Sequence, residues 1–413
     1  MTSVKNLSCL IESSRVINSS LRLSTVLNKV TTLSKNILKA ETGSLMLLDE
    51  KTKELVFSVA LGKKGTKIKR NIRIKKGQGI AGTTLKTGKS IVVNNTQKDP
   101  RFTGWVDKFS GFKTHSIMCV PLKVKGKIIG VLEAINSHNK KGFSSKDLDI
   151  FEAFACQVAI AIDNAKMHQK ILAEQKIDSE LQIARQIQQN LLPKECISDQ
   201  IDICGKNIPA EQVGGDLYDF FDLGDGKIGI MISDVSGKGI PAALCMMRIM
   251  SEFRLAAKTE TDPGSLLTNI NTILSEKPIF GMFVTLFYII IDKPNKKMKY
   301  TSAGHPPALY CTKDINKFMF LDKAQNPPLG IIQNIQYKTG ETDIIPASRI
   351  LLYTDGVTEA RSKNKEEYSL AKLQNTFYNS TNKNIIDEIS KSLNEHIQGA
   401  KPHDDWTLVS VCL

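Results

Sequence analysis

Four aspartates stand where an apolar, strand-like run meets a turn. They are Asp216 in VGGDLYDFF, Asp234 in MISDVSGKG, Asp355 in LLYTDGVTE and Asp404 in HDDWTLVSV. A carboxylate at the end of a buried strand costs desolvation energy unless it is paired or binds a cation. The repetition of this arrangement therefore favours a metal site over four unrelated surface residues.

The four aspartates form an all-oxygen donor set without histidine or cysteine. Such a set selects hard cations, and several carboxylates tolerate one another only when cations neutralise them. We therefore expect a site for two ions, Mn²⁺ or Mg²⁺. The alternative is that each aspartate caps a turn by accepting a hydrogen bond from its own backbone. That alternative stays open for any single aspartate, but it competes weakly for four together.

The chemistry expected of such a site is phosphoester hydrolysis. Two cations roughly 3.5 to 4 Å apart lower the pKa of a shared water, align it with the phosphorus and neutralise charge on the phosphoryl oxygens. No covalent intermediate is required. The chain has no CxxxxxR loop and no GxxxxGK[ST] loop, which argues against a cysteine-based phosphatase and a P-loop nucleotidase.

Three residues beside the aspartates each allow two interpretations. His305, in a Gly-His-Pro-Pro turn, either protonates the leaving alkoxide or only shapes the turn, and we favour the turn. Gly214 and Gly215 either let the chain approach the aspartates closely or form a tight turn.

The elements that must position these residues follow from the pattern of the second half of the chain. Helical periodicity predicts helices over 238–257, 262–276, 366–379 and 383–397. Apolar runs predict strands over 201–205, 227–233, 283–291, 298–302, 308–311, 350–354 and 407–411. This order fits a layered α/β sandwich better than a repeated βαβ unit.

The first half of the chain predicts a smaller α+β domain. Apolar residues at three- and four-residue steps predict a helix over 4–39. A second helical pattern begins at the N-cap candidate Ser144 and continues until Pro193. Five short strands are predicted between the two helices, over 44–48, 55–59, 90–93, 116–122 and 128–135.

Length and composition limit the class of protein. The 413 residues, 41% of them apolar, are sufficient for two globular domains. Residues 1–168 hold 29 basic and 12 acidic residues, net +17, while the remainder holds 27 and 30, net −3, which together give the total of +14. The basic half lacks aromatic interleaving and any nucleic-acid-binding motif, so we expect no nucleic acid partner. No apolar tract is long enough for a membrane span and no secretory signal is visible, so we expect a cytoplasmic protein.

The motifs of residues 200–413 resemble the metal-dependent serine/threonine protein phosphatases of the PPM superfamily, in particular the bacterial sporulation stage II E type. The matching runs are VGGDLYD, ISDVSGKGIPAAL, SAGHPPALY, NPPLGI, LLYTDGVTEA and HDDWTLV, preceded by the helix ELQIARQIQQNLLP. This resemblance implies an α-β-β-α sandwich and a protein phosphatase.

The resemblance also implies a role for each aspartate. Asp216 and Asp234 would be catalytic, with Asp234 bridging two metal ions and Asp216 in the same cluster. The carbonyl of Val235 would bind one ion, and Asp355 and Asp404 the other. Asp405 is the alternative to Asp404. Substrate anchoring would fall to the metal, and Lys238 or backbone N–H groups are further candidates.

Residues 1–168 resemble a GAF domain, a small sensory module with an antiparallel sheet and flanking helices. The resemblance rests on VPLKVKGKIIGVLEAIN (120–136) and FSSKDLDIFEAFACQVAIAIDNA (143–165). The ligand would be an unknown small molecule or protein. The basic stretch 63–76 is either a cationic rim for an anionic ligand or, as we favour, a solvated hairpin.

Together these patterns predict a GAF domain (1–168), a helical linker (169–199) and a phosphatase domain (200–413). By the resemblance, the substrate would be a phosphorylated anti-sigma-factor antagonist of the STAS type, in bacterial partner switching. A hydrolase of another phosphoester and a non-catalytic scaffold are the alternatives. We also expect a homodimer through the helices that flank the GAF domain. The linker is expected either to transmit a signal by its docking or to act as a rigid spacer.

Overall fold

The computed structural model describes residues 15, 19–60, 72–193, 201–276, 281–312, 317–381, 385–400 and 402–413. The chain divides into two compact units, Met1–Lys176 and Ile177–Leu413, and each is described by itself. No helix in the described part of the chain has the length and apolar character needed to cross a membrane.

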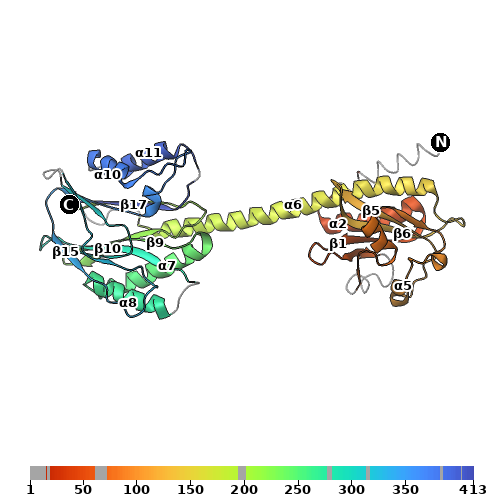
Figure 1. Ribbon diagram of the computed structural model, residues 1–413, viewed down its shortest axis with the longest axis horizontal. Coiled ribbons are helices and arrows are strands. Elements are labelled where there is room, and N and C mark those ends of the chain that lie inside the picture. Colours follow the sequence, from red (N-terminus) through yellow and green to blue (C-terminus); the bar gives the residue numbers. More distant parts are fainter. Residues whose placement is uncertain are drawn as a thin grey trace. The chain divides into compact units, whose positions relative to one another are not determined.

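The first unit is built on a six-stranded sheet in the order β3-β2-β1-β6-β5-β4, in which all neighbouring strands are antiparallel (Figure 1). Its strands are β1 (Ala40–Leu48), β2 (Leu55–Ala60), β3 (Arg73–Ile74), β4 (Ile91–Val93), β5 (Ile117–Val124) and β6 (Lys127–Ser137). Its shorter helices are α2 (Leu23–Leu38), α4 (Gly79–Thr87), η1 (Thr96–Lys98) and α5 (Trp105–Ser110).

Helices cover both faces of this sheet. Successive residues of a strand point to opposite sides, so β6 contributes to the core on each face. Leu132 and Ala134 of β6 belong to the core that contains Val30 of α2 and Phe154 of α6 (Ser145–Leu191). Val131 belongs to the second core, with residues of α4. An antiparallel sheet with flanking helices was predicted and is confirmed.

The predicted helix over 4–39 is wrong in part. Residues 1–14 and 16–18 lie outside the described residues, and α2 begins only at Leu23. Ser19 lies in a turn, and the backbone N–H of Arg22 donates to Ser20 Oγ at 3.2 Å. Serine side chains offer the backbone such local hydrogen bonds and so compete with the helix, whatever the apolar periodicity.

Helix α6 runs without interruption from Ser145 to Leu191, as predicted. Ser144 caps it through a reciprocal pair: Asp147 N–H donates to Ser144 Oγ at 3.3 Å, and Ser144 N–H donates to Asp147 Oδ2 at 2.8 Å. Pro193 follows the last helical turn, where its missing N–H and fixed φ prevent continuation.

The second unit is a sandwich of two sheets between two layers of helices, as predicted. One sheet has the order β14-β11-β10-β9-β8, with β15 also paired to β11, and the other has the order β13-β12-β16-β17-β7. The first contains β8 (Leu217–Gly224), β9 (Lys227–Val235), β10 (Val284–Asp292), β11 (Lys297–Ala303), β14 (Gln325–Asn326) and β15 (Gly340–Asp343). The second contains β7 (Asp202–Ile208), β12 (Leu309–Thr312), β13 (Lys317–Phe320), β16 (Ser348–Tyr353) and β17 (Trp406–Cys412).

The helices of this unit are divided between the two outer faces. Figure 1 shows α7 (Gly239–Ala256) and α8 (Pro263–Glu276) against the first sheet, and α10 (Leu370–Asn379) and α11 (Ile385–Ile397) against the second. One core fills the space between the sheets and continues under α7 and α8, and a second lies under α10 and α11. A short helix, α9 (Asp355–Thr358), follows β16.

Strand β8 was not predicted from the sequence, because its run LYDFFDLG carries two aspartates. Asp219 is buried inside the strand, and Arg254 Nε of α7 donates to its Oδ2 at 2.6 Å. The arginine supplies the charge partner that makes a buried strand aspartate tolerable. Strands β13, β14 and β15 were also missed.

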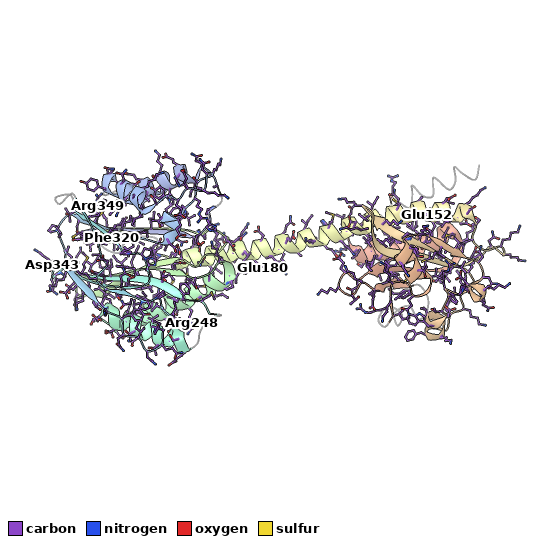
Figure 2. The ribbon with its side chains drawn as sticks, in the orientation of Figure 1. Glu152, Glu180, Arg248, Phe320, Asp343 and Arg349 are labelled. Carbon is purple, nitrogen blue, oxygen red and sulfur yellow. The ribbon has the colours of Figure 1, made fainter. Side chains whose placement is uncertain are left out.

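Arg349 of β16 joins the second sheet to α10. Figure 2 labels this side chain, which is almost fully buried. Its guanidinium donates to the carbonyl oxygens of Ser380 at 2.7 Å and Tyr378 at 3.2 Å and lies over the Phe377 ring. These bonds satisfy carbonyls at the helix end, where the helix itself has no donor left. We assign Arg349 a structural role.

Candidate active site

Asp234 and Val235 end strand β9, in the interior of the first sheet. β9 lies between β8 and β10, and its residues 228–233 are all buried. Burial, together with the charges of Asp355, Asp404 and Asp405, raises the pKa of Asp234 to about 7. An anionic Asp234 is therefore costly here unless a cation is present.

Asp216 is held deep in the sandwich, immediately before β8. Its Oδ2 accepts hydrogen bonds from Thr354 Oγ1 at 2.8 Å and Thr407 Oγ1 at 2.7 Å. Burial, followed by the charge of Asp234, raises its pKa well above the ordinary value. Asp216 and Asp234 thus raise the cost of ionising one another, and this cost falls when a cation is present.

Asp355 follows β16 as the first residue of α9. Loss of solvent raises its pKa, and Asp404 raises it further. The chain packs tightly here, since a Cβ on Gly356 would come within 1.8 Å of the Asp405 carbonyl oxygen. Gly356 thus brings the start of α9 against the residues that precede β17.

Asp404 and Asp405 have different surroundings. Both oxygens of buried Asp405 accept backbone N–H groups, from Ala210 and Gly215, each at 2.7 Å. Asp404 Oδ2 lies 3.1 Å from Lys238 Nζ, an ion pair that is partly open to solvent. Lys238 Nζ also donates to the His403 carbonyl. Asp405 therefore fixes backbone, whereas Asp404 can exchange its lysine for another cation.

Gly214 and Gly215 permit a close approach. A Cβ on Gly214 would lie 2.3 Å from Asp405 Oδ2, and one on Gly215 would lie 2.9 Å from the Val235 carbonyl oxygen. Neither glycine has a positive φ. Of the two interpretations, close approach and a tight turn, the clashes that a Cβ would meet favour close approach.

Gln188 of α6 was not recognised from the sequence. This buried side chain donates from Nε2 to the Gly214 carbonyl at 2.7 Å and accepts from the Gly214 N–H at 3.1 Å. Arg254 Nη2 donates to the Leu191 carbonyl at the end of the same helix, at 2.8 Å. The last turns of α6 are thereby joined to the loop that leads into Asp216.

His305 is buried, and burial lowers its pKa to about 3. Its Nδ1 lies 2.8 Å from Thr285 Oγ1, and Thr285 pairs with Asp234 across the sheet. Ser302 Oγ accepts the His305 N–H and donates to the His305 carbonyl. A neutral, enclosed imidazole suits the structural role that we favoured and not the role of proton donor.

The residues fit a hard divalent cation by their chemistry. Carboxylates from β9, from α9 and from the residues just before β8 and β17 meet at one end of the sandwich, and their charges raise one another's pKa values. Across the described residues, however, no three His, Cys, Asp or Glu side chains are already arranged to hold one ion. Asp404 is turned to Lys238, and Asp216 to its two threonines. The ligand set Asp216, Asp234, Val235, Asp355 and Asp404 stays a prediction.

Comparison with known proteins agrees with this architecture. The model of the stage II sporulation protein E (SpoIIE) family matches residues 224–413, and that of the GAF domain matches residues 22–162. Phosphoserine phosphatase RsbU of Bacillus subtilis (strain 168) is 34% identical over 287 residues, which are 67% of this chain and 85% of RsbU. The chain belongs to the RsbU and SpoIIE phosphatase family. It is a protein phosphatase of the PP2C type that carries a GAF domain.

Two further relatives cover less of the chain. Phosphoserine phosphatase RsbP of Bacillus subtilis (strain 168) is 29% identical over 184 residues, 44% of this chain and 45% of RsbP. The solved SiaA-PP2C domain of Pseudomonas aeruginosa covers 58% of this chain and 98% of its own, with a TM-score of 0.50 and 20% identity, and it shares the fold. Phosphatases of this family depend on Mg²⁺ or Mn²⁺.

Proposed function

We propose that this phosphatase removes phosphate from serine or threonine of a STAS-type anti-sigma-factor antagonist, in the cytoplasm and under control of its GAF domain. The observation that carries the proposal is the meeting of acidic residues from four separate segments of the chain at one end of the sandwich. The names of RsbU and RsbP, phosphoserine phosphatases, support the type of phosphoester.

In this proposal two ions bind at the acidic end. Asp234 would be shared between them, the carbonyl of Val235 would help hold one, and Asp355 and Asp404 would help hold the other, with Asp216 in the same cluster. The bound ions would supply an activated water and neutralise the charge on the phosphoryl oxygens. Asp216 and Asp234 are the catalytic carboxylates of this arrangement.

The protein's own residues pre-organise this end of the sandwich. Thr354 and Thr407 orient Asp216, and Asp405 holds the Gly214–Gly215 segment by its backbone. Lys238, at the N-terminus of α7, is the candidate to meet the substrate phosphate once Asp404 turns to an ion. Fixed donors of this kind assist catalysis because they need no reorganisation during the reaction.

We propose that the GAF domain binds a small ligand or protein and that α6 transmits the result. Most of the basic stretch 63–76 lies outside the described residues. The domain bounds 1–168, 169–199 and 200–413 are part of this proposal, and the last turns of the linker contact the Gly214 loop through Gln188.

We also propose a homodimer. Helix α6 exposes more than half of the surface of Ile177, Ile183 and Ile187. Exposed apolar side chains that lie close together are typical of an interaction surface. Light scattering at micromolar concentration tests the dimer, and a monomer would contradict it.

The function is tested by release of phosphate from the phosphorylated STAS protein of the source organism. We expect turnover with Mn²⁺ or Mg²⁺, loss in a chelator, and recovery when the metal returns. Nucleoside monophosphates serve as the rival substrate. Equal turnover of nucleotide and phosphoprotein would favour a general phosphoesterase, and no turnover of either with metal would favour a scaffold.

A further inference from the structure

An exposed apolar surface lies beside the loop that follows Asp234. We call it the apolar rim and define it as Met282, Phe283, Ile331 and Ile332. Phe283, Ile331 and Ile332 expose 38%, 54% and 46% of their surface. Exposed apolar side chains that gather in one place mark interaction sites more often than isolated ones do.

Hydrogen bonds place the rim next to the candidate active site. Ser236, two residues after Asp234, donates its N–H to the Phe283 carbonyl at 2.9 Å, and the Phe283 N–H donates to Ser236 Oγ at 2.9 Å. A Cβ on Gly237 would lie 3.8 Å from Met282 Sδ. The rim is therefore continuous with the segment 234–238, which contains both Asp234 and Lys238.

The two isoleucines belong to the same surface and are held in place. Val284 and Leu329 exchange backbone hydrogen bonds at 3.1 and 2.8 Å, which joins the isoleucine loop to the end of β10. Asn271 of α8 is fully buried, accepts the Gly330 N–H at 2.8 Å and donates to the Ile332 carbonyl at 2.8 Å. The Asn271 amide fixes the loop because both its oxygen and its nitrogen are hydrogen-bonded in a buried position. The two isoleucines are therefore exposed on an ordered loop.

We infer that the apolar rim is the docking surface for the folded phosphoprotein substrate. The inference rests on the proposed function, since a phosphoserine bound at the proposed metal site brings the substrate residues around it onto the neighbouring surface. The partner it fits is a folded domain with apolar residues next to its phosphorylated serine. Apolar contacts of this kind would select a protein over a small phosphoester, because a small ester cannot reach them.

The test uses the full chain with Mn²⁺ and two substrates: the phosphorylated STAS protein and p-nitrophenyl phosphate. The variants are Phe283→Ser and the double variant Ile331→Ser/Ile332→Ser. We expect kcat/KM for the phosphoprotein to fall about tenfold or more, mainly through KM, while turnover of the aryl phosphate stays within about twofold. Phe283→Leu, which keeps an apolar side chain, should retain most of the wild-type KM.

Met319→Ser is the matched control, because Met319 of β13 is 39% exposed and lies in the other sheet. Met319→Ser should leave kcat/KM for the phosphoprotein and turnover of the aryl phosphate unchanged. An unchanged KM for the phosphoprotein in the rim variants would overturn the inference, and so would an equal loss on both substrates, which indicates a damaged fold. A change of oligomeric state with unchanged KM would assign the rim to a second copy of the chain instead. If the wild-type protein hydrolyses neither substrate, the proposed function itself fails.

Discussion

Glu133 in the GAF unit and Asp234 in the phosphatase unit both have a pKa raised to about 7, Glu133 by burial and Asp234 by burial together with the charges of neighbouring aspartates. Their neighbours differ. Glu133 accepts a hydrogen bond from Ser44 Oγ at 2.5 Å and lies near Cys119 Sγ at 3.8 Å. Asp234 faces Asp216 and the charges of three further aspartates.

This difference separates two ways of burying a carboxyl group. A single carboxyl surrounded by apolar residues removes its charge by taking up one proton. Several carboxyls at one place can share protons only at a cost, because each charge disfavours the next. A divalent cation satisfies all of them together, so the acidic cluster predicts metal binding and the lone glutamate predicts pH sensitivity.

The largest effect is expected from Asp234→Asn. Loss of a bridging carboxylate should reduce turnover of the phosphoprotein by on the order of 10³-fold, measured with saturating Mn²⁺. In a chelator, the same variant should melt at a higher temperature than the wild type, because one repelling charge is gone. Scanning calorimetry with and without Mn²⁺ measures this second effect.

Asp343→Asn serves as the control for Asp234→Asn, since Asp343 ends β15 and takes no part in the cluster (Figure 2). It should change neither turnover nor the melting temperature in chelator. An Asp234→Asn protein that retains wild-type turnover would refute the metal assignment. A lower melting temperature in chelator would show that the carboxyls do not repel one another in the folded protein.

The second effect belongs to the GAF unit and to pH. The folded-state pKa of Glu133 is raised from 4.5 to about 7, so its protonated form is favoured by folding. The resulting stability is fully present below pH 4.5 and is lost as the pH rises through about 7, in total on the order of 3 kcal/mol. Amide hydrogen exchange of β6 in the full chain, measured from pH 5 to 8 and corrected for the intrinsic rate, reports this loss.

Glu133→Gln should remove that pH dependence, because a neutral amide occupies the same volume at every pH. Glu152→Gln is the control, since Glu152 is exposed on α6, where it accepts a hydrogen bond from Ser90 Oγ. Equal protection of the wild-type β6 amides from hydrogen exchange at pH 5 and pH 8 would contradict the predicted role of Glu133.

The sequence predicted the elements well wherever one periodicity dominates. The long helix ending before Pro193 and the strand before Asp234 are examples. Strand β8 was missed because a residue far away in the chain stabilises it. Arg254 pairs with Asp219 within β8, and a local sequence pattern cannot reveal this contact. The region of Ser19 shows the opposite case: Ser19 lies in a turn, Ser20 Oγ accepts the Arg22 N–H, and α2 begins only at Leu23, although the apolar pattern predicts a continuous helix there.

The site was predictable only in its acidic residues. Their positions follow from strand ends, but their orientations depend on residues far away in the chain. Asp216 is fixed by Thr354 and Thr407, which are 138 and 191 positions away. The different surroundings of Asp404 and Asp405 likewise depend on the distant backbone donors of Ala210 and Gly215. No local sequence pattern contains these contacts.

The smallest effect is expected from Gln188→Ala, which tests whether α6 influences the acidic end. The amide pairs with both backbone groups of Gly214, and the next N–H, that of Gly215, binds Asp405. Its removal leaves two buried backbone groups unpaired, at a cost of roughly 1–3 kcal/mol. The loop can meet this cost by moving, which would displace Asp216 and weaken metal binding.

We therefore expect Gln188→Ala to need several-fold more Mn²⁺ for half-maximal turnover, with a smaller decrease at saturating metal, and the Gly214 amide to exchange faster. Gln189→Ala is the matched control, because it removes the same side chain from the next, exposed position of the helix. A purely structural role for Gln188 would lower thermal stability without changing the metal requirement. If both variants have the wild-type requirement for Mn²⁺, the helix acts as a spacer and the GAF unit controls the phosphatase by another route, or not at all.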